Sequence, residues 1–460
     1  MTITREFSVR GKRVTVVGAA RSGVAAAYLL ARRGATVTLS DLQPSIPEEA
    51  ELRAAGVQLE LGAHDPATFT RADIIVLSPG VPSAQPAIAA ARAAGVHVMG
   101  ELELASRWLR GRIVAITGTK GKSTTTTLTG RMLEAGGHHV LVGGNIGHPL
   151  SAQVESSRPD TIHVVEASSF QLESVETFRP WISVLLNFSP DHLDRHGSLD
   201  EYAAAKSRIF VNQTAADWAV LNADDAAVAP MAAAAASRKL MFSMSDSLAA
   251  GVVLRGEQIV RRTADGDQPL VPLSSIRLLG RHLIADVLAA SAVASLAGVD
   301  AAAMTQAVES FKGLEHALEP VTDISGVLFV NDSKATNVEA ARRAIESFDS
   351  VVVIMGGRFK GGELGDLTAP LRQRNATVVA IGEAQDLIAS TFSGAIPVRP
   401  AADMSAAVRM AFASAAPGTT VVLAPACASF DMFRDYADRG RVFKQEVARL
   451  REEWNGVREQ

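Results

Sequence analysis

The chain alternates short apolar runs with helix-forming sequence, and this alternation limits its fold more than any other feature. The first cycle runs RVTVVG (Arg13–Gly18), SGVAAAYLLARRG (Ser22–Gly34), ATVTLSD and, further on, DIIVLSPG (Asp73–Gly80). Apolar strands separated by helices predict a parallel sheet that is covered by helices on both faces. Ser22 is a candidate N-cap of the first helix, and Gly34 is a candidate stop just beyond it.

The same alternation occurs twice more. A second run starts at IVAITG (Ile113–Gly118), continues through TIHVVEASS and WISVLLNFS, and closes with an Ala-rich helix around Asp286–Ala297. A third contains GVLFVNDS, SVVVIMGG, ATVVAIG and TTVVLAPA, and FKGLEHALEPV (Phe311–Val321) is a plausible hinge before it. Because 460 residues are too many for one core, we expect an α/β chain in three parts.

Composition excludes several classes of protein. The net charge of −4, from 45 Lys+Arg against 49 Asp+Glu, argues against a broad basic surface for nucleic acid. The start, MTITREFSVRGKR, lacks the apolar region of a secretory signal, and no apolar run reaches the roughly 18 residues of a membrane span. The one cysteine, Cys427, allows no intramolecular disulfide, and we expect it to be a small buried residue. A cytoplasmic location is therefore expected.

The first glycine motif has three interpretations. Gly18-Ala19-Ala20-Arg21-Ser22-Gly23 lies between a strand and a helix, and Asp41 ends the next strand. The pattern is similar to a dinucleotide fingerprint, although Ala20 replaces the middle glycine. A nicotinamide site, a plain tight turn, and a site for another diphosphate such as a nucleotide sugar all remain open.

The second glycine motif is more specific. ITGTKGKST, from Ile116 to Thr124, follows a strand and opens a Thr-rich helix. Such a loop points backbone N–H groups at phosphate oxygens, while Lys122 supplies a charge and Ser123 a hydroxyl for Mg²⁺. The strict pattern GxxxxGK(S/T) is not met because Ile116 stands at its first glycine. The segment instead fits the variant TGTxGK(S/T).

Ionisable residues elsewhere in the middle part suit metal chemistry. Glu166 ends the strand TIHVV, where a carboxylate is a natural Mg²⁺ ligand in a phosphate-binding domain. His192 lies in NFSPDHLDR after another strand, but a single histidine is more often structural. Lys206 lies in a short helical segment, where a lysine is ordinarily solvated.

Eight segments together resemble the Mur ligase family. They are GTKGKST, GGNIG, EASSFQLE, LNFSPDHLDRH, YAAAKSRIF, VNDSKATN, GGRFKGG and PACASFDMF, in the family's order from residue 118 to residue 433. With the N-terminal pattern, the resemblance covers essentially the whole chain. VNDSKATN and PACASFDMF are most similar to the member of the family that adds glutamate.

The resemblance implies three domains: a Rossmann-like UDP-binding domain (1–100), a central P-loop ATPase-type parallel sheet that binds ATP (101–313), and a Rossmann-like amino-acid-binding domain (314–460). It implies a ligase of peptidoglycan precursor synthesis, and hence of cell-wall biogenesis and cell division. ATP would phosphorylate the carboxylate of UDP-N-acetylmuramoyl-L-alanine, and D-glutamate would attack the acyl phosphate. It further implies ATP as co-substrate and two Mg²⁺ ions. The expected partners are the small-molecule substrates, with no nucleic acid and no membrane span, and a monomer is expected.

The resemblance also assigns roles to residues. The catalytic set is Lys122, Glu166, His192 and Lys206, and the metal positions are Ser123, Glu166, His192 and Lys206. ATP would be held by Gly118, Thr119, Lys120, Gly121, Lys122, Ser123, Thr124, Asp332 and Lys334. The UDP substrate would be held by Ser22, Gly23, Asp41, Ser78, Gly80, Asn145, Gln171 and His192, and D-glutamate by Thr336, Lys360, Ser429 and Phe430.

Lys206 falls on the family's carbamylated lysine. A carbamate converts an ammonium group into an anion that can ligate or orient a metal. Carbamylation requires an unprotonated amine, so we expect burial or neighbouring cations to lower the pKa of Lys206.

Three positions depart from the family pattern, all on the nucleotide side. Leu283 and Asp286 replace two asparagines that normally approach adenine, and Ala317 replaces an arginine of the ATP site. These changes put nucleotide affinity in question and leave a non-catalytic binding homologue as one alternative. A sibling ligase for another amino acid, a folylpolyglutamate synthase and a nicotinamide dehydrogenase are the others.

Overall fold

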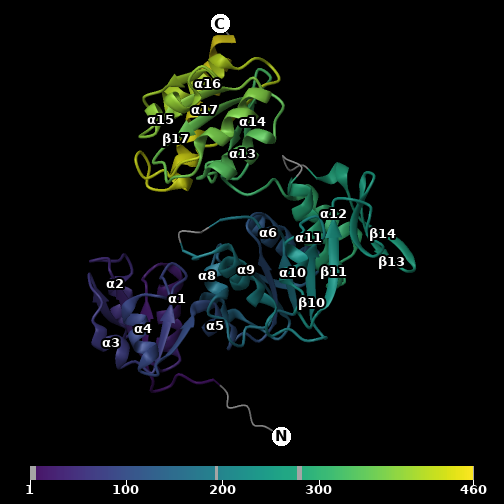
Figure 1. The fold of residues 1–460 in the computed structure, drawn as a ribbon. Coiled ribbons are helices and arrows are strands. Elements are labelled where there is room, and N and C mark those ends of the chain that lie inside the picture. The colour runs from purple at the N-terminus through teal and green to yellow at the C-terminus, as the bar shows by residue number, and fades with distance from the viewer. Residues whose placement is uncertain (1–6, 192–194, 277–281, 459–460) are drawn as a thin grey trace. The chain divides into compact units, whose positions relative to one another are not determined.

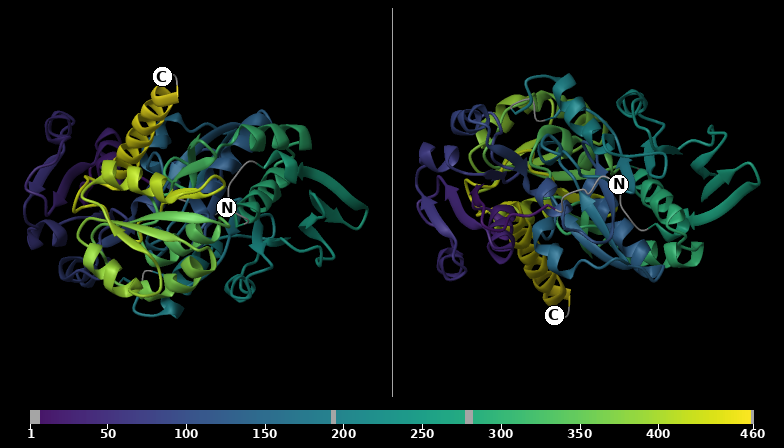
Figure 2. Two further views of the ribbon diagram at one scale, coloured as in Figure 1. Left: turned by 90° about the horizontal axis from the view of Figure 1, so that it is seen from above. Right: turned by 90° about the horizontal axis from the view of Figure 1, so that it is seen from below.

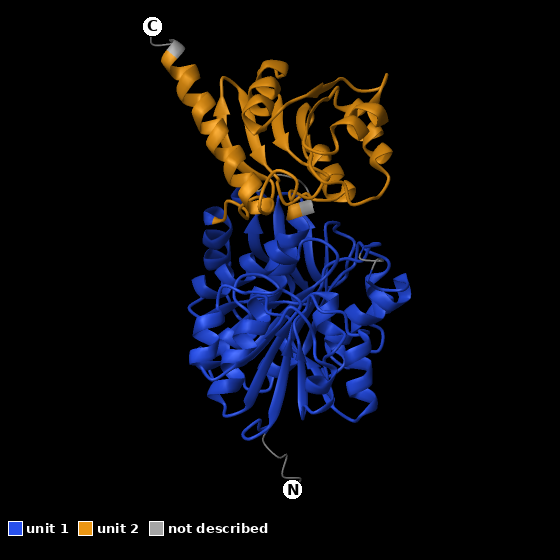
Figure 3. Cartoon of the chain, turned by 90° about the vertical axis from the view of Figure 1, so that its left-hand side faces the viewer, with its two compact units in different colours: residues 1–276, 284–310 blue, residues 277–283, 311–460 orange. Residues whose placement is uncertain are grey.

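The computed structural model describes residues 7–191, 195–276 and 282–458. The chain divides into two compact units, one of residues 1–276 and 284–310 and the other of residues 277–283 and 311–460 (Figure 3). The first unit contains two sheets and the second contains one. Each unit is described separately.

The first sheet is parallel throughout, as predicted, with the order β3-β2-β1-β4-β5. Its strands are β1 (Arg13–Val17), β2 (Thr36–Asp41), β3 (Gln58–Leu61), β4 (Ile74–Leu77) and β5 (His97–Gly100). Its helices are α1 (Arg21–Arg32), α2 (Glu49–Ala54), α3 (Pro66–Thr70), α4 (Pro86–Ala93) and α5 (Glu101–Ser106). Alternate residues of β4 face opposite sides, so Ile74 and Val76 pack with α1 while Ile75 and Leu77 pack with α3 and α4.

The start of α1 differs from the prediction. Ala20 occupies the N-cap position in an extended conformation, and Ser22 lies inside the first turn. The Ser22 prediction was wrong because the chain turns into the helix directly after Gly18, which has a φ of +92°. Gly34, with a φ of +81°, does lie just beyond the helix end.

The central sheet is mixed, whereas the sequence predicted a parallel one. Its order is β14-β13-β12-β11-β10-β9-β6-β8-β7, and the strands from β12 to β7 in that order pair parallel with one another. The strands are β6 (Arg112–Thr117), β7 (His139–Gly144), β8 (Thr161–Glu166), β9 (Ile182–Leu185), β10 (Trp218–Asn222), β11 (Arg238–Ser243), β12 (Gly251–Arg255), β13 (Gln258–Thr263) and β14 (Gly266–Pro272).

The departure from parallel pairing lies at one edge. β12, β13 and β14 pair antiparallel, and in two views β13 and β14 extend away from the helices (Figures 1 and 2). Only Gly256 and Glu257 separate β12 from β13, and two residues can join strands only in a hairpin.

Helices and short 3₁₀ turns cover the central sheet. They are α6 (Lys122–Ala135), α7 (Leu150–Gln153), η1 (Val154–Ser156), α8 (Ser169–Leu172), α9 (Leu199–Ser207), η2 (Arg208–Phe210), α10 (Val228–Met231), η3 (Leu273–Ser275), α11 (His282–Leu296) and α12 (Ala301–Ser310). No helix among the described residues is long and apolar enough to cross a membrane.

The second unit has the order β15-β16-β20-β17-β18-β19 and is parallel except for β15. Its strands are β15 (Glu319–Ile324), β16 (Val327–Asn331), β17 (Val351–Gly356), β18 (Thr377–Ile381), β19 (Val398–Pro400) and β20 (Thr420–Leu423). Its helices are α13 (Val338–Glu346), η4 (Leu364–Leu367), α14 (Thr368–Gln373), α15 (Gln385–Phe392), α16 (Met404–Ser414) and α17 (Tyr436–Arg458). One face packs on α13, α14 and α15, and the other on α16 and α17.

Candidate functional site

The second glycine motif forms a loop between β6 and α6. Gly118 and Gly121 have φ angles of +154° and +83°, which an L side chain rarely adopts. Gly121 is the N-cap of α6, so the motif ends at the N-terminus of a 14-residue helix. Free N–H groups at such a terminus favour an anion. The loop therefore has the backbone expected of a phosphate site.

Asn187, which the sequence analysis assigned no role, holds this loop. It lies just after β9, the neighbour of β6 in the sheet. Its Oδ1 accepts from the backbone N–H groups of Thr119 (3.1 Å) and Lys120 (2.9 Å), and its Nδ2 donates to the Lys120 carbonyl (3.0 Å). One amide side chain thus fixes the loop at three backbone atoms. The position of Asn187 at a strand end beside the loop was the available signal.

Two lysines meet at one carbonyl oxygen of the loop. The Nζ atoms of Lys122 and Lys206 donate to the Gly118 carbonyl at 2.9 and 2.8 Å, and Lys122 also donates to the Thr119 carbonyl at 2.9 Å. Lys122 lies at the start of α6, and Lys206 lies in α9. The fold therefore brings together two predicted catalytic lysines that are far apart in sequence.

Lys206 is buried, with 1% of its surface exposed, and is not solvated as an isolated helical lysine would be. Burial, together with the smaller effect of the nearby charge of Lys122, lowers the pKa of Lys206 to about 6. Asp191 and Glu166 oppose this shift. The Nζ also lies 4.7 Å from the centre of the Tyr202 ring. The lowered pKa that carbamylation requires is therefore present.

Glu166 ends β8 and is almost fully buried. Its Oε1 accepts from Nδ2 of Asn145 at 2.7 Å, which unites a predicted metal residue with a predicted substrate residue. Its Oε2 has no hydrogen-bond partner among the described residues. A buried carboxylate oxygen without a partner is unfavourable unless a cation or water completes it. Glu166 therefore fits the Mg²⁺ role predicted for it.

His192 lies outside the described residues, so its predicted metal and substrate roles have no structural counterpart here. Its neighbour Asp191 forms an ion pair of 3.2 Å with Lys120 of the phosphate loop. Within the described ranges, no three His, Cys, Asp or Glu side chains form a metal cluster. The predicted metal set of Ser123, Glu166, His192 and Lys206 is not of that kind, since two of its members are a serine and a lysine.

The first glycine motif forms a closely packed turn. The Ser78 hydroxyl donates to the Gly18 carbonyl at 2.8 Å. A Cβ on Gly23 would lie 1.8 Å from that carbonyl oxygen and 2.6 Å from the Ser78 hydroxyl, so only glycine fits there. Asp41 accepts from the backbone N–H groups of Ala19 and Gln43. Ser78, Gly23 and Asp41 thus meet at the carboxyl ends of β1, β2 and β4.

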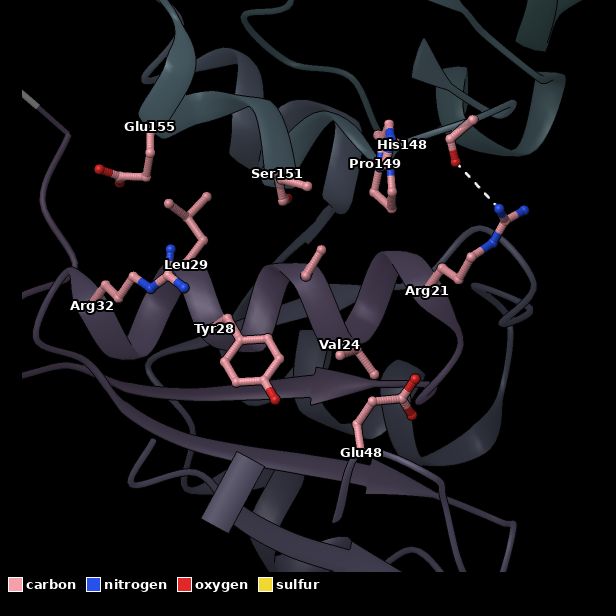
Figure 4. Close-up of a pocket in the computed structure, with 13 residues that line it drawn as sticks. Arg21, Val24, Tyr28, Leu29, Arg32, Glu48, His148, Pro149, Ser151 and Glu155 are labelled. Atoms are coloured by element: carbon pink, nitrogen blue, oxygen red, sulfur yellow. Dashed lines mark hydrogen bonds between the residues drawn. The ribbon is translucent and has the colours of Figure 1, made fainter. Parts of the chain in front are cut away.

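Two cavities adjoin this turn. A small one of about 20 Å³ is lined by both Ser78, which follows β4 of the first sheet, and Gln171, which lies in α8 over the central sheet, so it brings two predicted substrate residues together. A larger one of about 610 Å³ lies between α1 and α7, where Arg21 donates to the Gly147 carbonyl at 3.3 Å (Figure 4). Its wall contains arginine and glutamate side chains of opposite charge, so it favours no single class of ligand.

In the second unit, the predicted residues follow three adjacent strands. Asp332, Lys334 and Thr336 follow β16, Lys360 follows β17, and Ser429 and Phe430 follow β20. Parallel strands open their carboxyl ends on one edge, where α/β folds bind ligands. Ser429 is buried, while Phe430 is 65% exposed.

Asp332 is distinct among these residues because its carboxyl group is buried. Its Oδ1 accepts from the Leu318 N–H at 3.1 Å. Burial raises the pKa of Asp332 to about 7, and the Leu318 N–H and the charge of Lys334 oppose this.

The three departures lie on two segments of the chain. The Asp286 side chain packs against the phosphate loop, since a Cβ on Gly121 would lie 2.2 Å from its Oδ1. Leu283 and Asp286 lie in the first turns of α11. Ala317 is half-buried in the turn before β15. Asp286 therefore affects the part of the site that would hold phosphate.

Cys427 is buried, as predicted, and burial raises the pKa of its thiol to about 11.

Three family models match the chain. They are the N-terminal domain of MurD-like Mur ligases at residues 12–100, the Mur ligase middle domain at 116–294, and the Mur ligase glutamate ligase domain at 318–427.

Comparison with individual proteins gives matches along nearly the whole chain. It is 47% identical over 447 residues to the UDP-N-acetylmuramoylalanine–D-glutamate ligase of Acidobacterium capsulatum, covering 96% of this chain and 97% of that protein. It is 44% identical over 455 residues to the protein of the same name from Koribacter versatilis, covering 97% and 99%.

Solved structures are similar at lower identity. UDP-N-acetylmuramate-alanine ligase MurC from Thermotoga maritima matches with a TM-score of 0.60 and 19% identity, covering 95% of this chain and 100% of that one. A pseudomurein peptide ligase type C from Methanothermus fervidus matches with a TM-score of 0.60 and 17% identity, over the same shares. These likenesses establish the three-sheet α/β fold.

Proposed function

We propose, for a chain that belongs to the Mur ligase family, that it uses ATP to join D-glutamate to UDP-N-acetylmuramoyl-L-alanine in peptidoglycan precursor synthesis. The observation that carries this proposal is the 44–47% identity, over nearly the entire chain, to proteins named for that reaction. The phosphate loop and the residues around it supply the chemistry.

The reaction needs an activated carboxyl group. A carboxylate is a poor electrophile, because oxide would have to leave. Transfer of the γ-phosphoryl group to the carboxylate oxygen releases ADP and gives an acyl phosphate. The amino group of D-glutamate then attacks the carbonyl carbon, an amide bond forms, and inorganic phosphate leaves. Lys122, at the start of α6, offsets the repulsion between the carboxylate and the γ-phosphate.

Glu166 and Ser123 would hold Mg²⁺, which supplies positive charge beside the phosphates when bound. The Oε2 of Glu166, which has no hydrogen-bond partner in the described part of the chain, supports this role. Lys206 has its pKa lowered to about 6, so its amine is largely neutral at pH 7 and is open to carbamylation. A carbamate at Lys206 would provide a second anionic ligand close to Glu166, and His192 completes the proposed metal set.

The substrates are assigned to strand ends. The UDP substrate is assigned to Ser22, Gly23, Asp41, Ser78, Gly80, Asn145, Gln171 and His192. ATP is assigned to the loop from Gly118 to Thr124, with Asp332 and Lys334. D-glutamate is assigned to Thr336, Lys360, Ser429 and Phe430, which offer a cation and hydroxyl donors for two carboxylates. We assign these roles to domains 1–100, 101–313 and 314–460, in a cytoplasmic monomer.

An amino-acid panel tests the proposal. The protein is incubated with UDP-N-acetylmuramoyl-L-alanine, ATP and Mg²⁺, and phosphate release is measured for each amino acid. Release with D-glutamate alone is expected. Release with another amino acid would identify a sibling ligase, and no release with any would favour the non-catalytic homologue, whose support is Leu283, Asp286 and Ala317. A melting-temperature shift with NADH but not with the UDP substrate would overturn the proposal.

A further inference from the structure

Arg439 is the largest fully buried side chain in the part of the chain that the structure describes. It lies in the first turn of α17, on the helix that covers one face of the second unit's sheet. A buried guanidinium group is rare, because removing its charge from water is costly. Its contacts therefore require an explanation.

The guanidinium group of Arg439 contacts three loops. Its Nε donates to the Ser333 hydroxyl (2.9 Å), and one terminal nitrogen donates to the Ser333 carbonyl (2.9 Å). The other terminal nitrogen donates to the carbonyls of Cys427 (3.1 Å) and Gly356 (3.4 Å). In the described chain, each of these partners of Arg439 is a neutral oxygen. The hydrogen bonds therefore hold the surrounding loops in place and are not ion pairs.

These loops are the ones that carry the proposed amino-acid site. Ser333 follows β16, Gly356 ends β17 and Cys427 follows β20, and the three strands are adjacent in the order β16-β20-β17. Of the residues proposed to bind the amino acid, Thr336 lies three residues after Ser333, Lys360 four residues after Gly356, and Ser429 two residues after Cys427.

Backbone hydrogen bonds join these loops only in pairs among the described residues. Ala428 and Arg358 exchange two hydrogen bonds of 2.9 Å between the β20 and β17 loops, and Ala426 donates to the Ala335 carbonyl between the β20 and β16 loops. Arg439, by contrast, donates hydrogen bonds to all three loops.

We propose that Arg439 is a positioning residue, which fixes the β16, β17 and β20 loops relative to one another so that they bind the amino-acid substrate. This inference rests on the proposed function for the identity of that substrate. A planar fork with five donors suits the task, because it reaches several carbonyls at fixed angles, whereas a lysine offers one rotating ammonium group. Burial lowers the pKa of Arg439 to about 10, so the group stays charged at neutral pH.

The test compares Arg439→Lys and Arg439→Met with wild type in steady-state kinetics. We expect Arg439→Met to raise KM for D-glutamate by about tenfold to a hundredfold, since small misplacements of binding groups have effects of that size. The affinity for UDP-N-acetylmuramoyl-L-alanine, measured by calorimetry, should stay within about twofold, because its proposed residues belong to the other unit. The KM of Arg439→Lys for D-glutamate should lie between that of wild type and that of Arg439→Met.

A control separates positioning from general loss of stability. Val447→Ala, on the same helix, removes buried apolar contacts far along α17 from the loops. All variants are assayed at a temperature at which circular dichroism shows them folded. If Val447→Ala raised KM for D-glutamate as much as Arg439→Met at a similar loss of melting temperature, the inference would be wrong. A KM for Arg439→Met equal to that of wild type would also refute it.

Failure of the proposed function would appear in the wild-type protein. Wild type would then release phosphate with a different amino acid, or with none. With a different amino acid, the same variants are tested against that substrate, and the same rise in KM is expected. If wild type releases phosphate with no amino acid, calorimetry measures the affinity of wild type and of Arg439→Met for each amino acid of the panel. Equal affinities of the two proteins would refute the inference.

Discussion

Carbamylation of Lys206 gives the sharpest test of the site. Burial and the charge of Lys122 lower the pKa of Lys206 to about 6. At pH 7.5, a lysine with an ordinary pKa of about 10.4 is unprotonated in about one molecule in a thousand, and one with a pKa near 6 in almost all. The concentration of reactive amine at this one position is therefore about a thousandfold higher, and Lys206 should take up CO₂ selectively.

The measurement uses ¹³C-labelled bicarbonate and NMR. We expect one carbamate signal in the wild-type protein at pH 7.5, which fades as the pH falls below about 6 because the amine becomes protonated. Lys206→Met should lack the signal and lose most of its turnover. Lys239→Met, which removes an exposed lysine of β11, should keep both.

Two results would refute this reasoning. One is a wild-type protein that shows no carbamate signal at pH 7.5 while its turnover is normal. The other is Lys206→Met with wild-type turnover, since the site would then need neither the amine nor its adduct.

Three further predictions concern other parts of the first unit. Lys122→Ala should abolish turnover while calorimetry still detects binding of the UDP substrate, and retained turnover would refute its role. Gly23→Ala should destabilise the first sheet by about 1–3 kcal/mol in urea unfolding, because its Cβ would lie 1.8 Å from a carbonyl oxygen. As a control in the second unit, Gly365→Ala, whose Cβ meets nothing within 4 Å, should change stability little. Burial lowers the pKa of His163 to about 4. Below pH 6.5 the unfolded chain therefore binds more protons at this histidine than the folded chain does. The free energy of unfolding should therefore fall by about 3 kcal/mol from pH 6.5 to pH 4. In His163→Gln it should depend less on pH over that range.

The sequence predicted those parts of the fold that depend on local pattern. The strand, glycine loop and helix around Lys122 follow from an apolar run, two glycines and a polar helix start, and the structure has all three. The antiparallel edge of the central sheet was missed, although the two residues between β12 and β13 were a sign of it. A similar pair, Ser325 and Gly326 with φ angles of +56° and +83°, joins the missed strand β15 to β16.

The sequence analysis assigned no role to Asn187 or Arg439, for a different reason. Asn187 binds backbone atoms of a loop 67 and 68 residues before it in the chain, and Arg439 binds backbone carbonyls 12, 83 and 106 residues before it. A side chain that binds backbone needs no particular residue type at the other end, so the sequence contains no matching partner to notice. Lysines and carboxylates around a phosphate loop can be inferred from their chemistry, but the residues that hold such loops can be found only once the strands have placed them. Asn187 in the first unit and Arg439 in the second each link loops at the carboxyl ends of adjacent parallel strands. Geometry that supports a site is therefore set by contacts between the ends of neighbouring strands, and the residues to test first are the buried polar ones located there.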